Sequence, residues 1–284
     1  MNHIGILSNP NQEGIAQSVL HLAKRFIERG ASVLIADDLK AIGNLDADRF
    51  CSKERLAAQS DLLVAMGGDG TILRAAALVQ GYDTPILGVN LGRLGFLAGA
   101  EPSELEVGLD RLLEGDYTIE SRMALMAKVQ GQCVFALNEV VVERAVAARM
   151  VHVKTWIGDA TVSSFWGNGL ILSTPTGSTS YSLSSGGPIV HPEMDALILT
   201  PISPHSLTLR PLVVPGDQTV TVQVSAVHSD IVLSTDGRTV AQLKPEEQVF
   251  IQKAPHPVRL INLQGLSFYE VLRRKLDWSL DRRT

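Results

Sequence analysis

The sequence predicts two domains, an N-terminal α/β domain built on a parallel sheet and an all-β C-terminal domain. Short apolar runs alternate with stretches of helical periodicity over residues 1–116, as in a parallel sheet covered by helices. β-rich segments separated by Gly, Pro and Asp-Gly turns dominate residues 117–264, which is typical of an all-β domain. The last segment, 265–284, is helical again and is expected to pack back on the first domain.

The first domain is expected to alternate strands and helices in order. Short apolar runs bounded by turn residues are the predicted strands, at 3–8, 32–36, 62–66 and 85–90. Apolar residues at helical spacing predict helices at 15–27, 71–79 and 103–114. Gly30 follows the first of these helices, where a C-terminal cap belongs.

The second domain is expected to consist mainly of strands. The clearest predicted strands are at 136–142, 150–157, 169–172, 218–224 and 231–234. The tail at 269–280 has Leu272, Leu276 and Leu280 on one side, which predicts an amphipathic helix that must bury that side.

Composition excludes several classes of protein. The 284 residues are 45% hydrophobic and 19% charged, which excludes disorder, and the net charge of −5 disfavours a dedicated nucleic-acid binder. No apolar run reaches the roughly 18 residues needed to span a bilayer, and no signal peptide is expected. Cys51 and Cys133 are too few for a disulfide framework and lack metal-ligand spacing, so a reduced, cytoplasmic setting is expected.

A glycine–aspartate turn follows the strand predicted at 62–66. It consists of Gly67, Gly68, Asp69, Gly70 and Thr71. Ligands of α/β proteins bind outside the carboxyl ends of strands, and glycines before a helix N-terminus let a phosphate approach the backbone. A carboxylate repels phosphate, so Asp69 is expected to bind magnesium, to accept a proton from a hydroxyl group, or both. The alternative is a tight turn in which Asp69 is the N-cap of the helix.

Two polar stretches lie in the second domain. Asn138 and Glu139 place an amide and a carboxylate inside an apolar strand, where burial without partners is costly. A ribose diol would suit either side chain, and a strand end paired with nearby loops is the alternative. Residues 173–182 contain seven Ser or Thr side chains, which suit sugar and amide groups, and Tyr181 is a candidate to stack on a base or nicotinamide ring. An ordinary surface turn is the alternative here.

Together these stretches resemble the NAD kinase family, and the resemblance covers nearly the whole chain. The matching segments are 67–71, 90–97, 138–139, 173–179, 204–212 and 268–278. The glycine–aspartate turn alone is shared with phosphofructokinases and with diacylglycerol and sphingosine kinases. Its combination with the other two stretches, in this order, is specific to the family.

The resemblance implies a phosphofructokinase-like first domain and a kinase that transfers the γ-phosphoryl group of ATP to the 2′-hydroxyl of the adenosine ribose of NAD. The product is NADP. The resemblance also implies a divalent metal ion, usually Mg²⁺, bound with the nucleotide and without an assigned set of protein ligands. A homo-oligomer, dimer or tetramer, is also implied, while the composition argues against a nucleic-acid or membrane partner. Other nucleotides and polyphosphate stay open as donors.

Family roles carry over by matching position. Asp69 is expected to accept the proton of the 2′-hydroxyl, and Gly67, Gly68, Gly70 and Thr71 to form the turn that holds the phosphates. The residues expected to contact NAD are Asp69, Gly70, Arg74, Asn138, Glu139, Arg149, Trp166, Asn168, Thr179, Ser180, Tyr181, Ser182, Leu183, Ser184 and Arg238.

Some of these positions depart from the common family pattern. Asn168 stands where many members have Asp, so a contact keeps its acceptor but loses its charge. Trp166 replaces a polar or charged residue of some bacterial members, which leaves an NADH-accepting kinase open. Arg238 stands where glutamine is common, and Ser180 where alanine is usual.

Two further readings stay open. A lipid kinase of the same superfamily would need a slot for an acyl chain, and it would leave both polar stretches of the second domain unexplained. A non-catalytic NAD or NADP sensor would keep the fold without the chemistry, but it has no need of Asp69 among its glycines.

Overall fold

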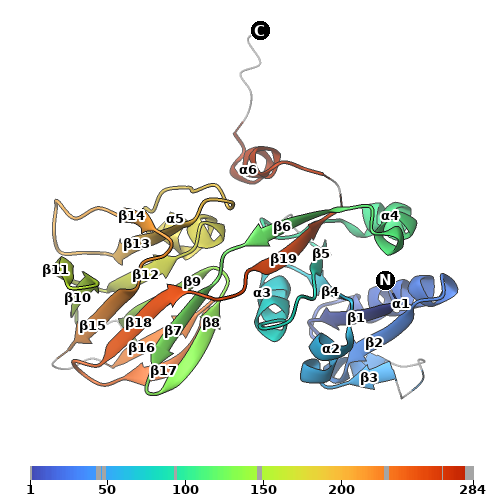
Figure 1. Ribbon diagram of the computed structural model, residues 1–284, viewed down its shortest axis with the longest axis horizontal. Helices are drawn as coiled ribbons and strands as arrows, with labels where there is room; N and C mark the ends of the chain where they lie inside the picture. Colours follow the sequence, from blue (N-terminus) through green and yellow to red (C-terminus); the bar gives the residue numbers. More distant parts are fainter. Residues whose placement is uncertain are drawn as a thin grey trace, which may run out of the picture. The chain divides into compact units, whose positions relative to one another are not determined.

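The computed structural model describes residues 2–42, 46, 49–92, 95–145, 149–226, 230–263 and 265–278 (Figure 1). The chain divides into two compact units. Unit 1 comprises Met1–Ser121 and Val258–Thr284, and unit 2 comprises Arg122–Pro257. No helix among the described residues is long and apolar enough to cross a membrane.

Unit 1 is built on a seven-stranded sheet. Its strands are, in spatial order, β3 (Phe50–Cys51), β2 (Ser32–Ala36), β1 (His3–Ser8), β4 (Leu62–Gly67), β5 (Ile86–Asn90), β19 (Val258–Asn262) and β6 (Thr118–Arg122). The first six are linked by parallel pairing. The order of the strands reverses at β1. From β1 the chain builds β2 and then β3 on one side, and it then crosses to the other side to form β4 and β5. Ligands bind at such a switch point, outside the carboxyl ends of the strands.

Helices cover both faces of this sheet. The helices α1 (Ile15–Glu28) and α4 (Pro102–Glu114) bury their apolar sides in one core with alternate residues of β1, β2, β4 and β5. The helices α2 (Lys53–Gln59) and α3 (Asp69–Leu78) pack on the opposite face. There Gly5 lies against Leu56 of α2 and Gly88 lies against Ile72 of α3. A short 3₁₀ segment, η1 (Asp37–Ile42), follows β2.

The C-terminal segment returns to unit 1. In Figure 1 the red strand β19 lies beside β5 and β6, and Arg259 Nη1 donates to the Asp83 carbonyl oxygen at 3.0 Å. The helix α6 (Phe268–Leu276) follows, and its Lys275 Nζ lies 5.6 Å from the centroid of the Phe96 ring. Ser267 caps α6 and Asp277 ends it in the left-handed conformation, so the helix is shorter than the predicted 269–280, whose last two positions lie outside the described residues.

Unit 2 contains two six-stranded sheets. The first has the order β11 (Ala160–Gly167), β10 (Val151–Ile157), β15 (Val220–Ser225), β18 (Gln248–Lys253), β7 (Leu125–Val129) and β8 (Gln132–Ala136). The second has the order β14 (Leu212–Pro215), β13 (Ala196–Ile202), β12 (Gly169–Ser173), β9 (Glu139–Arg144), β16 (Ile231–Thr235) and β17 (Arg238–Leu243). Apolar side chains from both sheets form one core, so the sheets pack face to face.

Two further differences from the sequence predictions concern the range assigned to the β domain. The strand predicted at 136–142 is interrupted, because β8 ends at Ala136 and β9 begins at Glu139. The backbone N–H groups of Leu137, Asn138 and Glu139 bond instead to the Asp236 carboxylate. In addition, β6 and β19 lie inside the range 117–264 assigned to the β domain, but they pair in the sheet of unit 1.

We predict that Gly169→Ala lowers the free energy of unfolding by about 1–3 kcal/mol, the usual cost of overpacking. Gly169 lies in the middle of a sheet, where an added Cβ would overlap the Val142 carbonyl oxygen and the Glu143 Cα. Gly92→Ala is the matched control, because no described atom lies within 4 Å of its added Cβ. Urea denaturation of both variants checks the prediction, which fails if they unfold at the same concentration.

Candidate functional site

The turn at 67–71, here called the phosphate turn, lies at the switch point of unit 1. Gly67 ends β4 with a φ of 150°, and an added Cβ would lie 2.5 Å from Thr71 Oγ1. The same Cβ would lie 3.3 Å from Gln12 Oε1, so the loop after β1 borders the turn. Sequence reasoning missed this loop at 9–14, although its position after the first strand of a parallel sheet was a signal for it.

Asp69 joins the phosphate turn to a second loop. One carboxylate oxygen accepts a hydrogen bond from Phe96 N at 2.9 Å and the other accepts from Leu97 N at 3.2 Å. An added Cβ on Gly95 would overlap the Asp69 carboxylate, so the loop approaches as closely as a glycine permits. Gly68, not Asp69, is the N-cap of α3, and no side chain caps it. The capping interpretation of Asp69 is therefore wrong. Arg93 and Leu94, in the matching segment 90–97, lie outside the described residues.

The start of α3 forms an open cradle. Gly68 and Gly70 have ordinary φ values, and no described atom lies within 4 Å of a Cβ added to either one. Neither backbone strain nor packing therefore explains these two glycines. A ligand that approaches the N–H groups at the helix N-terminus would explain them. Arg74 extends to the same turn, where its Nη2 donates to Thr71 Oγ1 at 3.4 Å.

In unit 2, the Asn138–Glu139 pair lies between the β16–β17 turn and the segment after β12. Asp236, in that turn, accepts from Asn138 N at 2.8 Å and from Glu139 N at 3.2 Å. Both side chains of the pair are buried. Among the described residues, neither Asn138 Oδ1 nor Glu139 Oε2 has a hydrogen-bond partner. Buried orphan acceptors are costly, so these two atoms are candidates to bind a hydroxyl-bearing ligand.

Glu139 is the most perturbed carboxyl group of this site. Burial, and secondly the negative charge of Asp236, raise its pKa to about 7. Its hydrogen bonds oppose the shift weakly, since Ser180 Oγ lies 3.4 Å from Glu139 Oε1. Glu139 therefore keeps its proton to a higher pH than an ordinary glutamate does.

The segment at 173–182, here called the hydroxyl loop, is largely buried and folded, which contradicts the reading as an ordinary surface turn. It contains η3 (Thr176–Thr179) and runs into α5 (Tyr181–Ser184). Thr174 Oγ1 donates to the Leu137 carbonyl oxygen at 2.7 Å, and a Cβ added to Gly177 would overlap the Asn138 carbonyl oxygen. The hydroxyl loop thus packs directly against the backbone of the Asn138–Glu139 pair.

The other predicted residues of the hydroxyl loop have different surroundings. The Tyr181 hydroxyl bonds the Glu143 carboxylate, and burial, then the charge of Glu143, raises the pKa of Tyr181. Ser182 Oγ lies 2.8 Å from Thr200 Oγ1, wholly inside the protein. Thr179 and Ser184 bond backbone carbonyls of their own segment, and Leu183 is half-buried.

The remaining predicted residues lie further along unit 2. Trp166 is half exposed and stacks on His152, with 4.9 Å between the ring centroids. Asn168 uses its backbone N–H and carbonyl to join Ile202 and Arg144. Arg149 is exposed just before β10, and Arg238 begins β17, where its charge favours the ionised form of Asp236.

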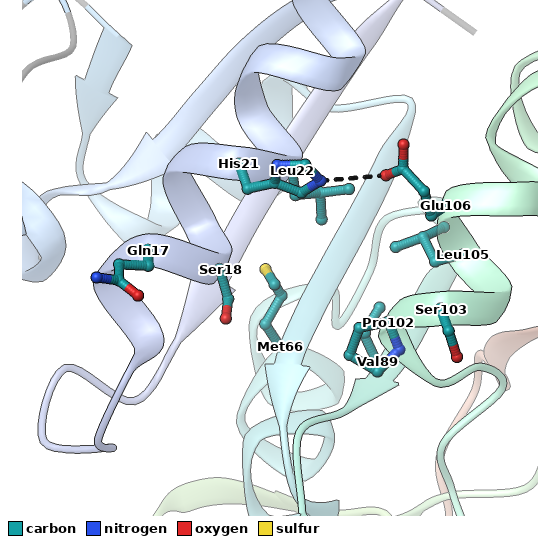
Figure 2. A pocket seen from close by; sticks show the side chains of 10 residues that line it. All are labelled: Gln17, Ser18, His21, Leu22, Met66, Val89, Pro102, Ser103, Leu105 and Glu106. Carbon is teal, nitrogen blue, oxygen red and sulfur yellow. Dashed lines mark hydrogen bonds and ion pairs between the residues drawn. The ribbon is translucent and has the colours of Figure 1, made fainter.

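A cavity of about 390 Å³ lies on the face of the unit 1 sheet that α1 and α4 cover. Figure 2 shows Met66 and Val89 at its floor, with α1 and the start of α4 as its walls. His21 Nε2 and Glu106 Oε2 lie 3.3 Å apart across one side. Met66 directly precedes the phosphate turn, but none of the residues predicted to contact NAD lines this cavity.

We predict that the stability of the protein falls between pH 4.5 and 7 more steeply than that of Glu139→Gln. The folded-state pKa of Glu139 is about 7, against 4.5 for the free side chain, so the folded protein holds the proton longer than the unfolded chain. Protonated Glu139 therefore stabilises the folded protein fully below pH 4.5, and this contribution to the free energy of unfolding is lost as pH rises through 7. Each tenfold difference in proton affinity is worth about 1.4 kcal/mol, so a loss of about 3 kcal/mol is expected. Urea denaturation at several pH values checks this, and parallel curves for the two proteins contradict it.

Family models match most of the chain. The ATP-NAD kinase N-terminal domain matches residues 4–117, and the ATP-NAD kinase C-terminal domain matches residues 137–263. The NAD kinase of Geotalea daltonii is 39% identical over 277 residues, covering 95% of this chain and 95% of its own. The NAD kinase of Moorella thermoacetica is 41% identical over 280 residues, covering 97% of this chain and 89% of its own.

Solved structures share the fold. A crystal structure of yeast NADH kinase complexed with NADH superposes with a TM-score of 0.88 at 23% identity, covering 100% of this chain and 90% of its own. An NAD kinase from Archaeoglobus fulgidus in complex with ATP gives a TM-score of 0.76 at 26% identity, covering 95% of this chain and 98% of its own. These matches confirm the predicted fold class and the resemblance: the chain belongs to the ATP-NAD kinase family.

Proposed function

We propose that the protein is an NAD kinase, which transfers the γ-phosphoryl group of ATP to the 2′-hydroxyl of the adenosine ribose of NAD. The observation that carries the proposal is the position and hydrogen bonding of the Asp69 carboxylate. Asp69 lies at the start of α3 between glycines whose Cβ positions are open, and its carboxylate is fixed by the backbone amides of Phe96 and Leu97. Family membership supplies the reaction class, and this geometry supports a working phosphate turn.

The phosphate turn is proposed to hold the donor. Phosphoryl transfer depends on positioning and on stabilising the charge of the phosphoryl oxygens. The first turn of α3 offers N–H groups and the positive end of a helix dipole. Arg74, proposed as an NAD contact, places its cation beside Thr71 of the same turn.

Magnesium fits this arrangement as a companion of the nucleotide. Among the described residues, no group of three or more His, Cys, Asp or Glu side chains is placed to hold a metal ion. Asp69 contributes a single carboxylate beside the turn, and Mg²⁺ commonly combines one or two carboxylates with substrate phosphates and water. When bound, the ion would neutralise charge on the phosphates.

Asp69 is proposed to accept the proton of the attacking hydroxyl group. Each carboxylate oxygen accepts one amide hydrogen bond and keeps a second lone pair for the substrate. An aspartate is a weak base for a hydroxyl group, so Asp69 takes the proton late, as the new P–O bond forms.

Unit 2 is proposed to bind NAD. The orphan oxygens of Asn138 and Glu139 suit the hydroxyl groups of a ribose, and Ser180 lies beside them. Tyr181 is 36% exposed and offers a ring for the nicotinamide half. Further contacts to NAD are proposed for Arg149, Trp166, Asn168 and Arg238. Because Trp166 is neutral where some bacterial members have a polar or charged residue, NADH should be tested beside NAD as the phosphoryl acceptor.

We also propose that the kinase works in the cytoplasm as a homo-oligomer. The reduced setting inferred from Cys51 and Cys133 supports the location, since both cysteines are free.

Asp69→Asn is expected to lower kcat by about 10²–10⁴-fold, the usual value of a positioned base, while NAD binding persists. The amide NH₂ of the new asparagine also points at a backbone N–H group, so one of the two hydrogen bonds is lost. The free energy of unfolding is therefore expected to fall by about 1–3 kcal/mol. A coupled assay with a strictly NADP-dependent dehydrogenase measures turnover, and calorimetry measures NAD binding. Asp83→Asn, an exposed change in the same unit, is the control. Wild-type turnover in folded Asp69→Asn protein removes Asp69 from this role.

Gly70→Ala is expected to raise KM for ATP about tenfold or more without loss of stability. The added Cβ meets no described atom, and alanine in a helix is about 0.5–1 kcal/mol more stable than glycine. Only the approach of a phosphate to the turn is obstructed. Initial rates over a range of ATP concentrations, with thermal denaturation in parallel, test this. An unchanged KM would show that the phosphates lie elsewhere.

A further inference from the structure

The strongest unassigned feature of unit 2 is the carboxylate of Asp236. One oxygen accepts from Leu137 N at 2.9 Å, and the other accepts from Asn138 N at 2.8 Å and from Glu139 N at 3.2 Å. In return, Asp236 N donates to the Glu139 carbonyl oxygen at 3.1 Å. Asp236 has a φ of 48°, in the left-handed region that Asp and Asn tolerate better than most residues.

The opposite side of the same backbone is held by the hydroxyl loop. Thr174 N donates to the Asn138 carbonyl oxygen at 2.9 Å, and Thr174 Oγ1 donates to the Leu137 carbonyl oxygen at 2.7 Å. The N–H groups of residues 137–139 are thus bound by Asp236, and the carbonyl groups of Leu137 and Asn138 by Thr174. With its backbone fixed on both sides, the Asn138–Glu139 pair has little freedom to change direction.

Asp236 also acts on Glu139 through its charge. Burial raises the pKa of both carboxyl groups, but three backbone N–H groups counteract the rise at Asp236, whereas Glu139 has only weak donors. The groups that face Glu139 are Asp236, the Ser180 hydroxyl and the Tyr181 backbone N–H; the Arg238 cation acts on Asp236. Asp236 is thus the nearby charge that disfavours ionisation of Glu139.

We propose that Asp236 is a positioning residue for the acceptor substrate: it fixes the backbone of the Asn138–Glu139 pair and sets the charge with which Glu139 meets the ribose hydroxyl groups of NAD. The inference rests on the proposed function. It gives Asp236 a role in NAD recognition without any contact between Asp236 and NAD.

Asp236→Asn is the variant that tests this role. Asparagine tolerates the same backbone conformation and keeps one acceptor oxygen, but it loses the charge and at least one of the three hydrogen bonds. KM for NAD is expected to rise about tenfold, while KM for ATP stays within about twofold. A ribose hydroxyl that donates to Glu139 favours its ionised form, so wild-type affinity should weaken below pH 7. In Asp236→Asn that weakening should move to lower pH, because the pKa of Glu139 falls when the neighbouring charge is removed.

Isothermal titration of NAD at several pH values measures the shift. Asp230→Asn is the matched control, since it removes an exposed carboxylate from the other end of β16 and should leave both KM values and the pH profile unchanged. An Asp236→Asn protein that is less stable, yet binds NAD with the wild-type pH profile and KM, overturns the proposal.

Thr174→Val provides a second test that keeps the charge of Asp236. It releases the same backbone from the carbonyl side, so KM for NAD should rise while the pH profile stays that of the wild type. If Asp236→Asn does not fold, an unchanged KM in Thr174→Val overturns the positioning argument by itself. A wild-type protein that forms no NADP and binds no NAD refutes the proposed function instead, which separates the two failures.

Discussion

Hydrogen bonds from backbone amides to a fixed carboxylate organise the candidate site in each unit. In unit 1, Asp69 receives the N–H groups of Phe96 and Leu97, and in unit 2, Asp236 receives those of residues 137–139. Each bond compensates a carboxylate for lost water and gives a loop a single position. The same type of interaction therefore fixes the phosphate turn in one unit and, in the other, the Asn138–Glu139 pair that is proposed to bind the ribose.

The glycines near these carboxylates follow from that arrangement. Gly95 and Gly177 are needed because a side chain would overlap the Asp69 carboxylate or the Asn138 carbonyl group. Gly68 and Gly70 are different, since their Cβ positions are open. A glycine that packing requires has a structural reason, whereas a glycine beside open space at a helix N-terminus is better explained by a ligand.

Local patterns were sufficient to predict four strands of the unit 1 sheet, β1, β2, β4 and β5, but not β3 or the place of β6 and β19 in it. The buried run at 62–66 became β4 almost residue for residue, because a fully buried strand needs continuous apolar sequence. Exposed strands such as β17 (RTVAQL) alternate weakly and were missed.

The interruption at 137–138 and the true partners of Asp69 were also missed. Both depend on hydrogen bonds between residues 27 to 99 positions apart, which no local window contains. The three polar stretches, in contrast, were visible because charged or hydroxyl residues in apolar surroundings need partners.

The return of the chain to unit 1 has a consequence for biosynthesis. β19 lies between β5 and β6, and Arg259 bonds to Asp83 across 176 positions of sequence. A ribosome that has made residues 1–121 has therefore produced a sheet that lacks the interior strand between β5 and β6. All of unit 2 must emerge before that gap can close, so the nascent first unit is exposed to chaperones and to non-native strand pairing until translation is nearly finished.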